Sequence, residues 1–124
     1  MKSFPMFIRL EGRKVVIVGG GEEAARKLRL MLKTEASITV MADEIDAEIS
    51  GLVAEGRVTH VQTICDLVAL KDARLVFVAT GCAAADASIA DLARIAGATV
   101  NVVDRPSLCD ATTPSIVDLS LIHI

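Results

Sequence analysis

Short apolar runs alternate along the chain with stretches in which apolar residues recur at helical spacing. Runs that are apolar at every position are typical of strands buried on both faces, as in a parallel sheet. The stretch from Glu22 places Ala25, Leu28 and Leu32 on one helical face. This pattern predicts strands at residues 15–18, 37–41, 57–62, 74–80 and 99–103, and helices at about 22–33, 44–55, 66–70 and 83–96.

The alternation of strands and helices with short connections predicts an α/β fold. We expect a Rossmann-like, doubly wound, mainly parallel five-stranded sheet with helices on both faces. Ligands of such sheets bind beyond the carboxyl ends of the strands. The segments that follow four predicted strands are therefore expected to line one cleft, namely residues 19–22, 42–44, 80–82 and 104–109.

The first predicted strand leads into three consecutive glycines and then into the first helix. Gly19, Gly21 and Ala24 match the small positions of the pattern G-x-G-x-x-G/A. Those positions allow a sharp turn, a close approach of pyrophosphate, and tight packing of helix on strand. The pattern predicts a dinucleotide site that meets the backbone of Glu22 and Glu23, where helix N–H groups are unpaired. A glycine-rich turn that binds nothing is the alternative.

Two acids, Asp43 and Glu44, follow the second predicted strand. In dinucleotide sites an acid about 20 residues past the glycines binds the adenosine ribose hydroxyls. Asp43 has about this spacing from Gly21, and its carboxylate would repel a 2′-phosphate, which favours NAD over NADP. The alternative is that Asp43 caps the following helix, because aspartate is a preferred N-cap residue.

Composition and charge narrow the class of partner. The 124 residues carry a net charge of −3 with acids and bases mixed, only 2% aromatics, and no Trp or Tyr. A nucleic-acid surface needs clustered positive charge and stacking platforms, so we expect no nucleic-acid partner. Three cysteines without C-x-x-C spacing, and no metal-ligand cluster around His60 or His123, indicate free thiols and no metal site. Without a signal peptide or a membrane span, a cytoplasmic protein with no membrane partner is expected.

Four segments in order carry a resemblance to a known family: FPMFIRLEGRKVVIVGGG, AARK, NVVDRPSLC and PSIVD. From residue 4 to residue 118 the chain resembles the N-terminal domain of siroheme synthase, the precorrin-2 dehydrogenase / sirohydrochlorin ferrochelatase family. It departs from the family at Gly81-Cys82, where an Asp pair is usual. The resemblance implies NAD-dependent oxidation of precorrin-2 to sirohydrochlorin, a tetrapyrrole, and in many members insertion of ferrous iron.

The resemblance also implies roles for individual residues. Asp104 matches the key acid, and a carboxylate beside the macrocycle can act as general base when ring oxidation removes a hydride and a proton. A turn acid that bonds local N–H groups is the alternative for Asp104. Asn101 and Pro106 are expected on the substrate side, although Asn101 can equally be a buried amide. The expected cofactor contacts are Gly19, Gly21, Glu22, Glu23, Asp43, Glu44 and, by position in the cleft, Thr80.

The resemblance bears on domain organisation as well. The family continues past PSIVD into a dimerisation region, so we expect residues 1–118 to be an NAD-binding Rossmann domain of a protein that is a homodimer at full length. Residues 119–124, LSLIHI, look like a translated library adapter and are expected to be a non-native tail. A non-catalytic NAD-sensing module is the main competing hypothesis, since the fold alone does not separate it from an enzyme. A dehydrogenase of another substrate is disfavoured, because no Ser/Tyr/Lys or His/Arg set is apparent.

Overall fold

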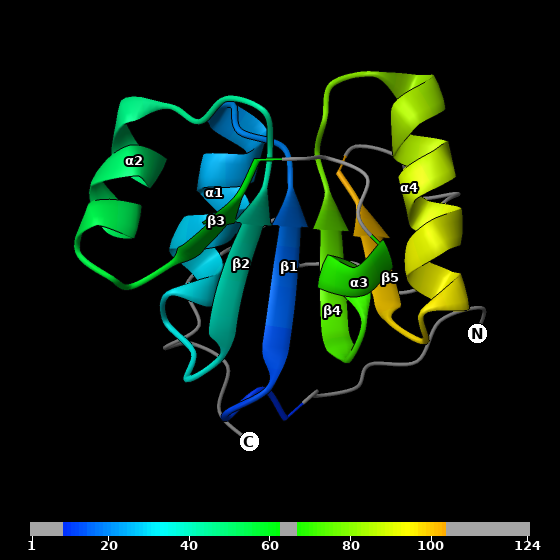
Figure 1. The fold of residues 1–124 in the computed structure, drawn as a ribbon, viewed down its shortest axis with the longest axis horizontal. Coiled ribbons are helices and arrows are strands. Elements are labelled where there is room, and N and C mark those ends of the chain that lie inside the picture. Colours follow the sequence, from blue (N-terminus) through cyan, green and yellow to red (C-terminus); the bar gives the residue numbers. More distant parts are fainter. Residues whose placement is uncertain (1–8, 63–66, 104–124) are drawn as a thin grey trace, which may run out of the picture.

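The structure, a computed structural model, describes residues 9–62 and 67–103 (Figure 1). The predictions for Cys65, Asp104, Pro106, Cys109 and residues 119–124 lie outside these residues. The elements are β1 (Lys14–Val18), α1 (Glu22–Met31), β2 (Ser37–Met41), α2 (Ala47–Ala54), β3 (Thr59–Val61), α3 (Leu67–Leu70), β4 (Ala73–Val78), α4 (Ala83–Ile95) and β5 (Thr99–Val102).

The five strands form one sheet in the order β3-β2-β1-β4-β5, and every neighbouring pair is parallel. β1 is central because residues 15–18 are fully buried, and a strand of this kind must be covered on both faces. All carboxyl ends point to the same edge, which is at the top of Figure 1. The predicted fold class is confirmed.

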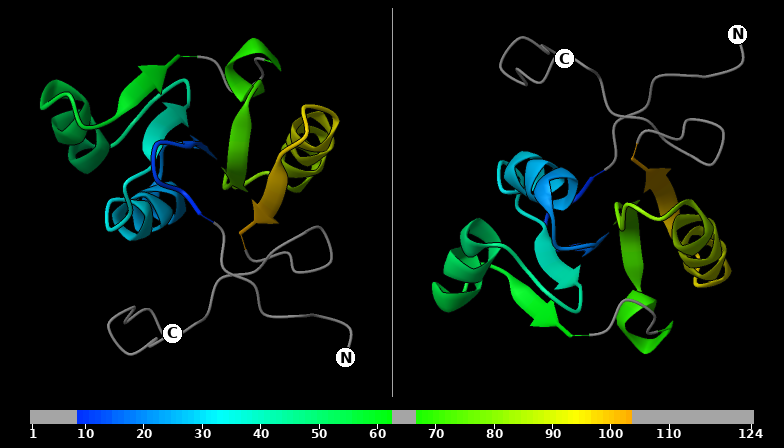
Figure 2. Two further views of the ribbon diagram at one scale, coloured as in Figure 1. Left: turned by 90° about the horizontal axis from the view of Figure 1, so that it is seen from below. Right: turned by 90° about the horizontal axis from the view of Figure 1, so that it is seen from above.

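Alternate strand residues face opposite helical layers, as the pleat of a strand requires. Val15, Ile17 and Phe77 pack in the cluster that α1 and α2 complete, and Val16 and Val76 pack in the cluster of α3 and α4. Figure 2 shows these two pairs of helices on opposite sides of the sheet. The two apolar layers fix the strands rigidly and so fix the loops at their carboxyl ends.

Several element boundaries differ from the sequence prediction, and β4 ends at Val78 rather than at residue 80, which leaves Thr80 in the following loop. α1 ends at Met31 rather than near Lys33, because the Thr34 hydroxyl donates to the Met31 carbonyl at 2.6 Å and closes a turn there. The edge strand β3 covers Thr59–Val61 rather than residues 57–62. α2 begins at Ala47 instead of about residue 44, and this difference bears on the candidate site.

An ion pair joins the two helices on one face of the sheet. Arg29 of α1 donates from Nε to Glu48 Oε2 and from Nη2 to Glu48 Oε1 of α2, each at 2.7 Å. These hydrogen bonds hold the pKa of the Glu48 carboxyl below its usual range. They also raise the pKa of the Arg29 guanidinium. The pair links α1 to α2 beside the loops that follow β1 and β2.

Candidate functional site

The candidate site lies where the connections of two neighbouring strands diverge. β1 and β4 are adjacent, yet β1 leads to α1 on one face of the sheet and β4 leads to α4 on the other. In open α/β sheets the crevice at such a switch point is where ligands bind. Figure 1 shows the two connections separating above the arrowheads of β1 and β4.

The first two glycines pack against the loops on either side of β1. Gly19 has a φ of +127°, which favours glycine, and a Cβ there would lie 2.8 Å from the Ala79 carbonyl carbon. A Cβ on Gly20 would overlap the Glu44 carbonyl oxygen and lie 2.9 Å from its carbon. The Gly20 carbonyl also accepts a hydrogen bond from Asp46 N at 3.2 Å. Gly20 is thus a further site residue, one that matching the glycine pattern alone does not select.

The third glycine is open to the crevice. Gly21 is the N-cap of α1, it makes no side-chain cap, and a Cβ there would meet nothing within 4 Å. The first-turn N–H groups of α1, which begins at Glu22, have no partner within the helix. Donors at a helix N-terminus with unobstructed access fit the pyrophosphate of a dinucleotide.

The acidic side chains of the first turn pair with arginines of the same helix. Glu22 lies 3.7 Å from Arg29, and Glu23 lies 3.5 Å from Arg26. Both pairs are solvent-exposed, and such pairs contribute little to stability. The carboxylates of Glu22 and Glu23 are thus engaged by arginines of α1.

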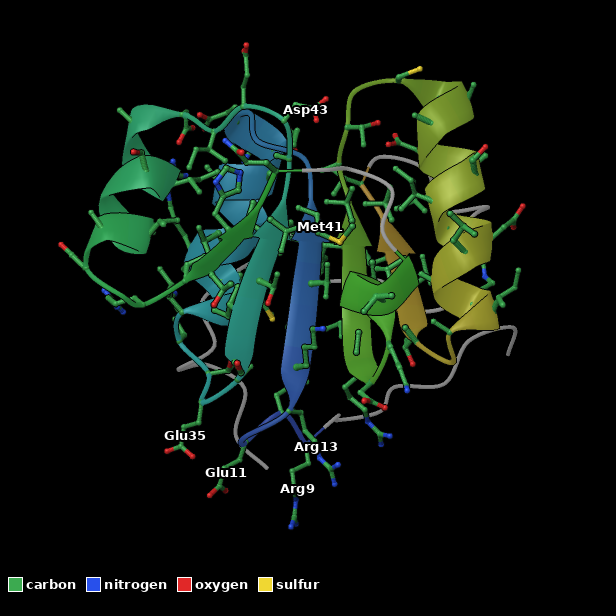
Figure 3. All side chains as sticks on the ribbon, in the orientation of Figure 1. Arg9, Glu11, Arg13, Glu35, Met41 and Asp43 are labelled. Atoms are coloured by element: carbon green, nitrogen blue, oxygen red, sulfur yellow. The ribbon has the colours of Figure 1, made fainter. Side chains whose placement is uncertain are left out.

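The N-cap of α2 is a different acid of the loop after β2 than the sequence alternative named. Asp46, not Asp43, caps α2, and its carboxylate accepts from Ile49 N at 2.9 Å. The alternative role of Asp43 as N-cap is therefore wrong. The helix starts later because the loop first passes along Gly20 and donates Asp46 N–H to it. Asp43 and Glu44 are exposed, and Figure 3 places Asp43 at the carboxyl edge of the sheet.

His60 supports the same loop. This residue of β3 is half-buried, and its Nε2 lies 2.9 Å from the Ala42 carbonyl oxygen. The Ala42 N–H donates to the Val61 carbonyl at 3.0 Å. β3 therefore holds the start of the loop that carries Asp43.

The loop after β4 forms the opposite wall of the crevice. Thr80 is half-buried, and its N–H and hydroxyl both donate to Asp86 Oδ1, at 3.0 Å and 2.5 Å. Asp86 lies in the first turn of α4 and is only 3% exposed. Sequence reasoning missed Asp86. The signal available was a carboxylate three residues before Ile89 on the buried face of an alanine-rich helix, where a charge needs a polar partner.

Asn101 lies on β5 beside β4. It is 5% exposed and pairs in register with Phe77, so its side chain is on the face covered by α1. A buried position is what the buried-amide alternative for Asn101 predicts. Asp104 follows the last described residue, Val103, directly in sequence.

Residues 9–62 and 67–103 contain neither a metal-ligand cluster nor a helix that could span a membrane. No group of three or more His, Cys, Asp or Glu side chains there could hold a metal ion. No helix in this part of the chain has the length and apolar character to cross a bilayer. Cys82, at the N-terminus of α4, is an exposed free thiol.

A parallel sheet with a glycine turn at its switch point defines a dinucleotide-binding α/β protein. The family model described as "Putative NAD(P)-binding" matches residues 6–115, and the chain belongs to this family. The predicted cofactor class, a nicotinamide dinucleotide, is thereby confirmed.

Relatives and a solved structure extend this result. The chain is 39% identical over 120 residues to the siroheme synthase of Methylobacillus flagellatus, covering 97% of this chain and 26% of that protein. It is 41% identical over 124 residues to the siroheme synthase of Pseudoalteromonas atlantica, covering 100% of this chain and 27% of that protein. The solved structure of "SirC, precorrin-2 dehydrogenase" matches with a TM-score of 0.65 and 30% identity, over 70% of this chain and 44% of that one. The resemblance to siroheme synthase is confirmed, and the chain spans about a quarter of the length of these two relatives.

Proposed function

We propose that this chain is the dinucleotide-binding part of an enzyme that oxidises precorrin-2 to sirohydrochlorin with NAD⁺. The observation that carries the proposal is the switch point between β1 and β4, where Gly21 at the start of α1 has open space beside it; the segment NVVDRPSLC begins in β5. The relatives named siroheme synthase and the neighbour named precorrin-2 dehydrogenase support the substrate.

The order of the strands predicts which end of the dinucleotide lies beside which loop. The loop after β2, with Asp43 and Glu44, would take the adenosine ribose. The N-terminus of α1 beside Gly21 would take the pyrophosphate. Because β4 lies on the far side of β1 from β2, Thr80 would face the nicotinamide half. We assign Asp104 to the reacting end, because it follows β5 in sequence and β5 lies beyond β4 in the sheet.

In the proposed reaction, precorrin-2 loses a hydride and a proton to two different acceptors. The bound NAD⁺ supplies the hydride acceptor. Asp104 acts as general base and takes up the proton that leaves the macrocycle as a new double bond forms. Asn101 and Pro106 are assigned to the substrate side by the same resemblance. Insertion of ferrous iron is proposed as a second reaction of the full protein, in which the inner nitrogens of the ring must also lose protons.

Further proposals concern the setting of this unit. Asp43 favours NAD over NADP, since a carboxylate repels a 2′-phosphate. Acidic and basic residues mixed along the sequence and an odd cysteine count support a cytoplasmic protein without nucleic-acid or membrane partners. Residues 1–118 form the dinucleotide-binding unit, residues 119–124 are a non-native tail, and the full-length protein is a homodimer.

The test is NADH formation from precorrin-2 and NAD⁺, measured beside NAD⁺ binding. We expect Asp104→Asn to lower the rate by about a hundredfold or more, the usual contribution of a general base, while NAD⁺ still binds. Asp91→Asn, a matched change on the exposed face of α4, should keep the full rate.

Two results would contradict parts of the proposal. NAD⁺ binding without turnover, in a protein of the length of these relatives that contains this chain, would favour the NAD-sensing module. Full turnover by Asp104→Asn would remove Asp104 as the base while leaving the dehydrogenase assignment intact.

A further inference from the structure

We infer that Asp86 is a positioning residue that holds the proton of the Thr80 hydroxyl, so that Thr80 presents a hydrogen-bond acceptor to the dinucleotide. The ligand group that Thr80 recognises is then a donor on the nicotinamide half, either a ribose hydroxyl or the carboxamide NH₂. The inference rests on the proposed function, which places a dinucleotide in this crevice.

The first step is the count of protons on Thr80. A threonine hydroxyl carries one proton and two lone pairs. Thr80 Oγ1 lies 2.5 Å from Asp86 Oδ1 and 3.3 Å from the Cys82 carbonyl oxygen. Both neighbours are acceptors, and the nearer one is a carboxylate, which forms the stronger hydrogen bond. The single proton therefore goes to Asp86.

The second step concerns the other polar groups of Thr80. Its N–H also donates to Asp86 Oδ1, at 3.0 Å. In the part of the chain that the structure describes, Cys82 N–H donates to Thr80 Oγ1 at 3.2 Å, which occupies one lone pair. The remaining lone pair is what the hydroxyl offers to a ligand. Thr80 thus has neither of its donors available for a phosphate oxygen.

The third step is why Asp86 can hold this arrangement. Asp86 is only 3% exposed as a residue, so little water can compete for Oδ1. It stands in the first turn of α4, where the helix dipole stabilises a negative charge. A buried carboxylate with donors arranged around it fixes those donors, because leaving it unpaired is costly.

The crevice therefore has two chemically different walls. The β1–α1 wall presents N–H donors at the start of α1, which suit phosphate oxygens. The β4–α4 wall presents an acceptor at Thr80, which phosphate cannot use but a hydroxyl or amide N–H can. The contact of Gly19 with the Ala79 carbonyl sets these two walls side by side. This asymmetry orients the dinucleotide as strand order requires.

The experiment compares three ligands with variants of this chain. NAD⁺, ADP-ribose and ADP are titrated calorimetrically into the wild type, Asp86→Ala, Asp86→Asn, Thr80→Val, Thr80→Ser and the double variant Asp86→Ala/Thr80→Val. Asp91→Ala, on the exposed face of the same helix, is the matched control. Amide hydrogen exchange at Thr80 reports the hydrogen bond from the Thr80 N–H to Asp86 directly, without any ligand.

We expect Thr80→Val and Asp86→Ala each to weaken NAD⁺ binding by about tenfold, the value of one well-formed hydrogen bond. The double variant should bind no more weakly than either single variant, because both remove the same contact. Asp86→Asn and Thr80→Ser keep the acceptor and should stay within about threefold of the wild type. Loss with ADP-ribose as well as NAD⁺ assigns the ribose hydroxyl, and loss with NAD⁺ alone assigns the carboxamide.

Exchange at the Thr80 amide should accelerate in Asp86→Ala and remain slow in Asp86→Asn. If Asp86→Ala does not fold, Thr80→Val removes the hydroxyl at nearly constant volume and tests the same contact. Wild-type affinity in Thr80→Val, or an equal loss for ADP, would overturn the inference alone, since ADP lacks the nicotinamide half. A wild-type chain that binds neither NAD⁺ nor ADP-ribose would overturn the proposed function and this inference together.

Discussion

Gly20 and Glu44 are in direct backbone contact, although they belong to the loops that follow two different strands. A Cβ on Gly20 would overlap the Glu44 carbonyl oxygen and lie 3.2 Å from the Cβ of Ala42. The adjacent hydrogen bond from Asp46 N to the Gly20 carbonyl closes the same junction. The loop proposed for the pyrophosphate and the loop proposed for the adenosine ribose therefore hold each other in place.

Gly20→Ala should therefore lower the free energy of unfolding. The added methyl group has to displace backbone atoms rather than a flexible side chain, so we expect a cost of about 2 kcal/mol, typical of overpacking. Because the displaced loop carries Asp43, NAD⁺ binding should weaken as well. Urea unfolding followed by circular dichroism measures the first effect, and calorimetric titration measures the second.

Gly21→Ala is the matched variant one residue further on. A Cβ at Gly21 meets nothing within 4 Å, and the residue has a φ of −95° that any amino acid adopts. We expect unfolding to change by no more than about 1 kcal/mol, the range for N-cap substitutions. NAD⁺ binding should nevertheless fall by about tenfold or more, because the methyl group occupies the approach of the pyrophosphate. Equal NAD⁺ affinity in the variant and the wild type would remove Gly21 from the site.

The fold followed from the sequence because its signals are local. VVIV is apolar on both faces, and a strand of that kind is stable only in the middle of a parallel sheet. The SITVM run gave β2 with the boundaries observed. Alternation with helices then restricts the sheet to few topologies. Boundaries failed where a tertiary contact decided them, as at α2, whose start depends on the Gly20 carbonyl.

The site was harder to predict from the sequence, because tertiary contacts also decide the roles of its residues. The glycine pattern marks a turn and an open helix N-terminus, and both are present. It does not show which glycine touches a neighbouring loop, so the role of Gly20 needed the structure. Asp86 became recognisable only when α4 placed its carboxylate under Thr80. Asp43 is not the cap of α2, because Asp46, three residues later, accepts the capping hydrogen bond.

Asp43→Asn should reduce the preference for NAD⁺ over NADP⁺. With Asp46 as the cap of α2, the Asp43 carboxylate is exposed and is not needed for helix stability. Removing its charge removes repulsion of a 2′-phosphate, and we expect the ratio of the two affinities to fall by about three- to tenfold. Competitive titration of both dinucleotides measures the ratio. Asp46→Asn is the matched control, since asparagine caps as well as aspartate and the ratio should not change.

The Arg29–Glu48 pair should make stability sensitive to acid. Its hydrogen bonds lower the pKa of Glu48 from the ordinary value of 4.5. The folded state therefore favours the ionised carboxylate more than the unfolded state does. A group of this kind stabilises the fold fully above its unfolded pKa and loses that contribution as the pH falls through its lowered folded pKa. The raised pKa of Arg29 would matter only in strong alkali. The sensitive window for the pair therefore lies below about pH 4.5.

Glu48→Gln should accordingly unfold at a lower temperature than the wild type at neutral pH, and the gap should close as the pH is lowered below that value. Thermal unfolding followed by circular dichroism across the acid range measures the gap. Both side chains are about half exposed, 48% for Arg29 and 40% for Glu48, so molar salt should also shrink the gap at neutral pH by screening. Glu55→Gln, at the exposed C-cap of α2, changes the same charge without an Arg29 contact and should show a smaller gap. A gap of equal size at neutral and acid pH would show that Glu48 acts through packing, and the ion pair would then contribute nothing to joining α1 to α2.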